Sequence, residues 1–148
     1  MVAAGVQEVI NQWLARLQEA GYRLTAPRRT VVEIVAGSAF MMTPQAVFDH
    51  ARYQYPQIGL VTVYRTLEKL ESLHLVQRIH QQDGCQAFIA RREGHQHPLI
   101  CQKCGRVAYF SGDADAMQAL SRHVAMSSGY VIQDHWLQFF GVCAACRE

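Results

Sequence analysis

The 148-residue sequence predicts an α+β protein built in two parts, and three features support this. Apolar residues recur at helical spacing through most of residues 1–73, and two short strand-like runs flank Asp83-Gly84. Four of the five cysteines then form two C-x-x-C pairs in the second half. We therefore expect a helical first domain over residues 1–84 and a metal-containing α/β domain over residues 85–148.

The composition is that of a folded protein, with 50% hydrophobic and 18% charged residues. No apolar run approaches the roughly 20 residues that span a bilayer, and the N-terminal residues lack the pattern of a secretory signal. We therefore expect a cytoplasmic protein with no membrane partner. The net charge of +2 is spread evenly along the chain, so charge alone does not indicate nucleic-acid binding and motifs must carry that case.

Three helices are expected before residue 54. The first is expected over residues 6–20, from apolar residues at helical spacing. Thr25 can cap a second helix that would end at Gly37. Thr43 before Pro44 is a strong start for a third helix, because proline at the first helical position loses no hydrogen bond.

A fourth helix and a hairpin follow. The helix has one apolar stripe, formed by Val63, Leu67, Leu70 and Leu73. The runs 75–79 and 86–89 on either side of an Asp-Gly turn predict a β-hairpin. This order is typical of a winged helix-turn-helix, whose second helix enters the major groove of DNA with its N-terminal residues. Tyr64 can pack against thymine methyl groups and Arg65 can reach guanine acceptors or a phosphate. The alternative is an ordinary core helix with an exposed Tyr and Arg.

The cysteine pairs give the most specific signal in the sequence. Two thiolates three residues apart can share one tetrahedral Zn²⁺, and two such pairs complete a closed four-sulfur site. The pairs are Cys101 with Cys104 and Cys143 with Cys146. We expect a structural zinc that fixes the C-terminus onto this domain; two disulfides or a redox dithiol are the alternatives.

A group of histidines predicts a second metal site. His95 and His97 are two apart, so in an extended segment both imidazoles point to the same side. Residues 130–140 alternate like a strand that carries His135, and residues 111–115 offer carboxylates before a helix expected over 116–127. Three imidazoles and a carboxylate suit Zn²⁺ or Fe²⁺, with Zn²⁺ favoured by intrinsic affinity. The alternative is a set of ordinary surface or core histidines.

Three segments, in this order, resemble the ferric uptake regulator (Fur) family of metalloregulators. They are GYRLTAPR at 21–28, GLVTVYRTL at 59–67 and HQHPLICQKCG at 95–105. The resemblance covers nearly the whole chain and implies that Arg23 enters an A·T-rich minor groove while Tyr64 and Arg65 read the major groove. It also implies that the second domain forms a homodimer, so that the partner is a palindromic operator in double-stranded DNA.

The resemblance also sorts the candidate metal ligands. His95, His97 and His135 are similar to the family's site within the dimerisation domain, and Asp115 is the carboxylate we expect there, with Asp113 or Gln118 as alternatives. The family's other site, near the hinge, draws on positions that are here occupied by residues that do not suit a metal: Gln96, Pro98, Tyr109, and Met41 or Met42. We expect that site to be missing or rebuilt from other residues.

The resemblance therefore implies a metal-responsive transcriptional repressor that is not an enzyme. The nitrogen-rich ligand set favours the zinc uptake branch, with an iron-responsive or peroxide-responsive regulator as alternatives. A zinc-dependent hydrolase would need an open coordination position and a general base, for which no motif is evident. An interaction module with only a structural zinc is the remaining alternative.

Overall fold

The computed structural model describes residues 4–81 and 83–147, and the chain divides into two compact units, Met1–Arg91 and Arg92–Glu148. The sequence boundary expected between residues 84 and 85 is therefore too early. Strand β2 (Gln86–Ala90) pairs along its whole length with β1 (Val76–His80), so the hairpin belongs entirely to the first unit.

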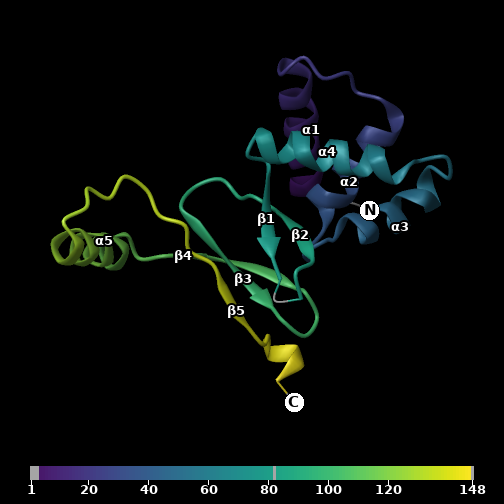
Figure 1. Ribbon diagram of the computed structural model, residues 1–148. Helices are drawn as coiled ribbons and strands as arrows, with labels where there is room; N and C mark the ends of the chain where they lie inside the picture. The colour runs from purple at the N-terminus through teal and green to yellow at the C-terminus, as the bar shows by residue number, and fades with distance from the viewer. Residues whose placement is uncertain (1–3, 82, 148) are drawn as a thin grey trace. The chain divides into compact units, whose positions relative to one another are not determined.

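The first unit contains four helices and this two-stranded antiparallel hairpin (Figure 1). The helices are α1 (Ala4–Glu19), α2 (Ala26–Gly37), α3 (Pro44–Gln54) and α4 (Leu60–Ser72). Their order confirms the α+β class and the helix, turn, helix and hairpin succession predicted from the sequence. None of the helices in the described part of the chain has the length and apolarity that a bilayer span requires.

The core of the first unit lies among its helices and one face of the hairpin. On α4, Val63, Leu67 and Leu70 are fully buried, as the predicted stripe requires. Leu73, directly after the helix, is half-buried against the same core. The segment between α2 and α3 is joined to the hairpin by two backbone hydrogen bonds between Met42 and Phe88, of 2.8 and 2.9 Å. The hairpin is therefore fastened to the helices by polar as well as apolar contacts.

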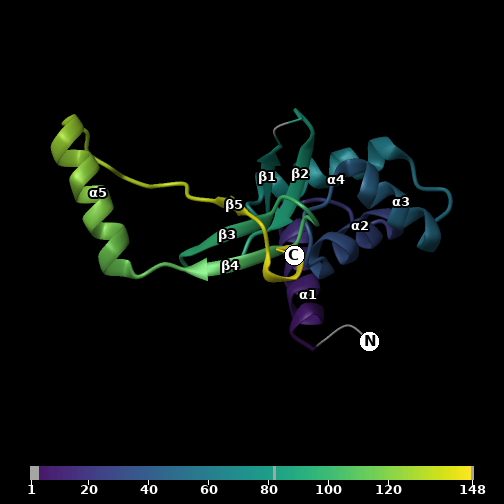
Figure 2. The ribbon, with the colours of Figure 1, turned by 90° about the horizontal axis from the view of Figure 1, so that it is seen from below.

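The second unit is a three-stranded sheet with one long helix. Its elements are β3 (Gln96–Cys101), β4 (Val107–Ser111), α5 (Ala114–Ser128), β5 (Phe139–Gly141) and the 3₁₀ turn η1 (Ala144–Cys146). The strand order is β4-β3-β5, with β4 antiparallel and β5 parallel to β3. From the end of α5 the chain returns as an extended segment to β5 (Figure 2).

The predicted strand over residues 130–140 is wrong for most of its length. Residues 130–138 have no regular secondary structure, and pairing with β3 begins at Phe139. The helix α5 also starts earlier than expected, because Asp113 serves as its N-cap and accepts a hydrogen bond of 3.0 Å from the backbone N–H of Asp115.

Candidate metal centres and nucleic-acid interface

The first cysteine pair lies in a tight turn at the end of β3. The backbone N–H of Gly105 donates to the carbonyl of Cys101 over 2.9 Å, and Gly105 has a φ of +73°, which favours glycine. The second pair flanks η1, where the N–H of Cys146 donates to the carbonyl of Cys143 over 2.9 Å. Each turn therefore presents two sulfurs on one side.

The parallel pairing of β5 with β3 brings the two turns together. Cys101 is opposite Gly141 in the register, so Cys143 follows two residues beyond the point of pairing. The N–H of Gln102 donates to the Gly141 carbonyl over 2.8 Å, and the Lys103 Nζ donates to the Cys146 carbonyl over 2.8 Å. The sheet thus closes the long separation between the pairs in the sequence.

The four sulfurs fit a single tetrahedral zinc ion. All four Sγ atoms lie within 4.8 Å of one another, and the Sγ atoms of Cys104 and Cys143 are 3.8 Å apart. Four sulfurs at about 2.3 Å from one zinc stand roughly 3.8 Å apart, whereas a disulfide would need about 2.05 Å. All five cysteines are free thiols in the structure, which rules against the alternative of two disulfides here.

Backbone amides prepare one of these thiols for metal binding. The N–H of Cys143 donates to the Cys101 sulfur over 3.3 Å, and this contact, with that of the Cys104 amide, lowers the pKa of Cys101 to about 6. Hydrogen bonds with Cys143 and Cys104 raise the pKa of the Cys146 thiol to about 12. A cluster that shares its protons in this way releases them when a metal ion binds.

The histidines form a second cluster, as the sequence predicts. Ligand nitrogens of His95, His97 and His135 all lie within 4.8 Å of one another. The ring centroids are 4.5 to 5.3 Å apart, and the His95 ring meets the rings of His97 and His135 edge to face. His97 lies in β3, His95 comes directly before that strand, and His135 belongs to the segment that returns from α5.

Two buried ring nitrogens of this cluster are suited to bind a metal ion. The Nε2 atoms of His97 and His135 are buried and have no hydrogen-bond partner. Burial lowers the pKa of His97, and the neighbouring His95 and His135 lower it further, whereas a hydrogen bond with the Leu137 backbone acts in the opposite direction. Both Nε2 atoms thus remain without a partner among the described residues. A metal ion is the natural partner for such atoms.

The expected carboxylate is not in this cluster. Asp115 is exposed and its oxygens do not join the group of mutually close ligand atoms in the described residues. A cavity of about 530 Å³ opens beside the histidines instead, and its lining residues are His95, Met117, Gln118, Ser121, Arg122 and His135. Gln118 is one of the alternatives that the sequence offers for this ligand, whereas Arg122 and the close approach of Gly112 to His97 were not predicted. The spacing of residues 118 and 122 on one helix face was the signal for Arg122.

The three residues expected to contact DNA are all exposed on the first unit. Tyr64 is 46% exposed, and Arg65 lies beside it in the N-terminal half of α4. Arg23 precedes α2, and its carbonyl accepts a hydrogen bond from the Arg28 guanidinium. Buried Val63 and Thr66 anchor the helix on its other side. The first unit therefore presents the N-terminal part of α4 outward.

The sequence of this chain is similar to those of known metal regulators. A sequence model of the ferric uptake regulator family matches residues 19–140. The ferric uptake regulation protein of Bacillus subtilis (strain 168) is 31% identical over 142 residues, covering 93% of this chain and 94% of the relative.

Solved structures show the same fold. A zinc-bound manganese uptake regulator superposes with a TM-score of 0.69 at 27% identity, covering 88% of this chain and 98% of its own. A zinc uptake regulator complexed with zinc and DNA superposes with a TM-score of 0.68 at 22% identity, covering 95% of this chain and 94% of its own.

Proposed function

This chain belongs to the ferric uptake regulator family of metal-responsive transcriptional regulators, and from that premise we propose that it is a zinc-responsive repressor of zinc uptake genes. In this proposal, one zinc ion holds the second unit together and a second zinc ion is the signal. The metal-loaded protein binds operator DNA, and metal scarcity releases it.

The histidine cluster is the observation that carries the proposal. Two of its three imidazoles have a buried Nε2 atom without a hydrogen-bond partner, which costs free energy unless a ligand is bound. The four cysteines form a closed site that offers no position for a second signal. We therefore assign sensing to His95, His97 and His135 and a structural role to the cysteines.

The donor atoms support zinc over iron as the signal. Three imidazole nitrogens suit Zn²⁺, whose intrinsic affinity for nitrogen ligands exceeds that of Fe²⁺. The solved zinc uptake regulator bound to zinc and DNA shares this fold. An iron-responsive or peroxide-responsive regulator is the alternative, and the names of the curated relatives favour the iron reading.

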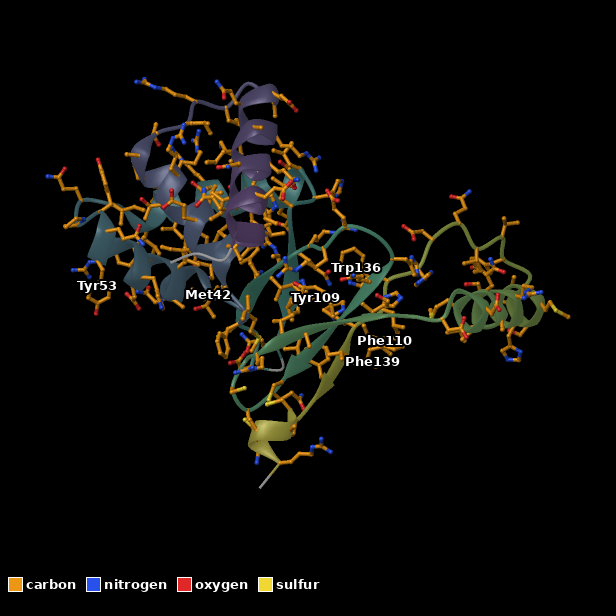
Figure 3. The ribbon with its side chains drawn as sticks, turned by 180° about the vertical axis from the view of Figure 1, so that it is seen from behind. Met42, Tyr53, Tyr109, Phe110, Trp136 and Phe139 are labelled. Atoms are coloured by element: carbon orange, nitrogen blue, oxygen red, sulfur yellow. The ribbon has the colours of Figure 1, made fainter. Side chains whose placement is uncertain are left out.

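DNA recognition is assigned to the first unit. Tyr64 and Arg65 at the N-terminal half of α4 suit major-groove contacts, and Arg23 suits the minor groove. The second unit is assigned to dimerisation. Its exposed aromatic residues include Phe110, Trp136 and Phe139 (Figure 3), a concentration typical of a protein interface. A two-fold dimer would read a palindromic operator in double-stranded DNA.

The mechanism is thermodynamic linkage. Metal binding ties β3 to the segment that returns from α5, and it stabilises the dimer arrangement in which both first units match the operator half-sites. The metal shifts this equilibrium only by its differential affinity for the two arrangements. A coupling free energy of about 1.4 kcal/mol between metal and DNA binding changes the DNA affinity tenfold.

The test combines metal content with DNA binding. Protein purified without added metal is analysed for zinc by mass spectrometry before and after mild chelation, with a DNA mobility-shift assay at each stage. We expect two zinc ions per chain to fall to one as DNA binding is lost. His135→Gln should hold one zinc and bind DNA weakly, whereas His123→Gln, an exposed histidine on α5, should behave as wild type. DNA binding that persists with one zinc per chain would refute the sensing site.

A further inference from the structure

The cavity beside the histidine cluster lacks a negative charge. Its volume is about 530 Å³, and the α5 residues that line it are Met117, Gln118, Ser121 and Arg122. No carboxylate belongs to this lining, and Asp115 lies outside the cluster. The polar groups that face the histidines are therefore an amide, a hydroxyl and a cation.

The charges at this site do not balance once a divalent ion is bound. Three neutral imidazoles leave the ion with its full charge of about +2, and the Arg122 guanidinium adds a further positive charge. Arg122 is held near the cavity by its Nε, which donates to the Gln118 carbonyl over 3.4 Å. Among the described residues, no carboxylate forms an ion pair with Arg122.

The coordination of the metal ion is also incomplete with these three histidines. Zinc prefers four ligands, and protein sites with three protein ligands keep the fourth position for an exogenous group. Two of the three histidines, His95 and His135, line the cavity together with α5, so an exogenous ligand can reach the ion from that side. Arg122 is on the same side, where its planar donors suit an oxygen anion.

We propose that this cavity binds a small oxoanion, a carboxylate or a phosphate, together with the metal. One oxygen of the anion completes the coordination of the metal ion, and another accepts hydrogen bonds from Arg122. The inference rests on the proposed sensing site and deepens it: the protein responds to the metal and the anion jointly. Because linkage is reciprocal, the anion tightens metal binding by the same factor as the metal tightens anion binding.

The experiment uses Co²⁺, whose visible absorption reports its coordination, on the full chain with zinc retained at the cysteines. Co²⁺ is titrated in a perchlorate buffer, then with acetate or inorganic phosphate added. We expect the anion to tighten Co²⁺ binding within the roughly 5- to 150-fold range of coupled sites and to change the absorption spectrum. Acetate and phosphate arms separate the carboxylate and phosphate sources.

Two variants isolate the role of the anion. Arg122→Gln should lose most of the gain, and comparison with wild type in the same buffer removes the effect of Co²⁺ chelation by the free anion. Gln118→Glu supplies a carboxylate from the protein, so its Co²⁺ binding should be tight and independent of added anion. His123→Gln on the same helix is the matched control and should keep the full anion response.

The outcomes separate the two proposals. Co²⁺ binding at the histidines with no anion response, and weakened by Gln118→Ala, would overturn the anion site and make the Gln118 amide the fourth ligand. Failure of Co²⁺ to bind at the histidines in every buffer would overturn the sensing site as well.

Discussion

At the scale of single residues, Gly112 is constrained by the histidine cluster. A Cβ atom there would lie 3.2 Å from Met117 Cγ and 3.6 Å from His97 Cδ2. The His97 ring is buried and cannot turn away freely. We expect Gly112→Ala to weaken metal binding at the histidines roughly 10- to 100-fold, the range seen when groups that orient metal ligands are altered, and to leave the cysteine-bound zinc in place.

Metal titration followed by absorption or calorimetry measures this effect. Gly141→Ala is the control, because a Cβ at Gly141 has no neighbouring atom within 4 Å and the residue belongs to the same unit. If Gly112→Ala and Gly141→Ala bind metal equally well, the close approach to His97 has no functional consequence.

Local spacing was enough to find most of the candidate ligands. The C-x-x-C pairs and the i, i+2 histidines identify themselves because their geometry is set within a few residues. Asp115 lies outside the group of close ligand atoms, because Asp113 caps α5 and position 118, not 115, lines the cavity. The starting residue of a helix, and hence its rotation, depends on such caps and is the least certain part of a sequence pattern.

At the scale of elements, Thr43 and Thr25 occupy equivalent N-cap positions of two helices and can be compared directly. Both are N-caps before a helix with proline in its first turn, but the Thr43 hydroxyl accepts a hydrogen bond of 3.1 Å from the Ala46 N–H, whereas Thr25 makes no such bond. Thr43→Ala should therefore destabilise the first unit by about 1 kcal/mol, and Thr25→Ala by much less. Urea unfolding monitored by circular dichroism compares them, and equal losses would contradict the capping argument.

The core face of α4 gives a larger expected effect. Leu67 is fully buried, so Leu67→Ala removes apolar contacts and leaves a cavity, at a cost of about 2–5 kcal/mol. Val61 on the same helix is 62% exposed, and Val61→Ala should change the unfolding free energy by less than about 0.5 kcal/mol. The same unfolding assay tests both, and a small loss for Leu67→Ala would show that the core can repack around it.

Helices were predicted more closely than strands for a physical reason. Each helix depends on contacts within four residues, so spacing and caps define it. A strand needs a partner that can be distant in sequence. Residues 130–138 alternate as a strand does, but Tyr130 and Val131 are 74% and 87% exposed, and the described chain offers them no partner strand. Only where Phe139 meets β3 does the pattern become a strand.

At the scale of the whole molecule, the pairing of β1 with β2 sets the domain boundary. A boundary at residue 84 would cut the hairpin at its turn and leave β1 with unpaired backbone groups. The N–H of Arg91 still donates to the Leu75 carbonyl over 2.9 Å, so the first unit extends through that residue. The Asp-Gly turn predicts this strand pairing, and a boundary after the second strand agrees with it.

The two units are expected to depend on metal very differently. Nearly all fully buried apolar side chains of the described residues lie in the first unit, and beyond Arg91 the buried apolar side chains are those of Pro98, Ile100 and Cys101. A domain of that size with so small a core needs a metal, a disulfide or a partner. Structural zinc contributes roughly 10–16 kcal/mol of binding free energy in small zinc domains.

Removal of all zinc with a strong chelator should therefore unfold the second unit and spare the first. Hydrogen exchange followed by mass spectrometry should show residues 92–147 losing protection while α1–α4 and the β1–β2 hairpin keep theirs. Cys104→Ser should reproduce this pattern without chelator, because it removes one ligand of the closed site. If β3 stays protected from hydrogen exchange in protein that contains no zinc, then strand pairing and self-association are enough to keep the second unit folded. In that case the cysteines would have to be assigned a role other than holding the fold.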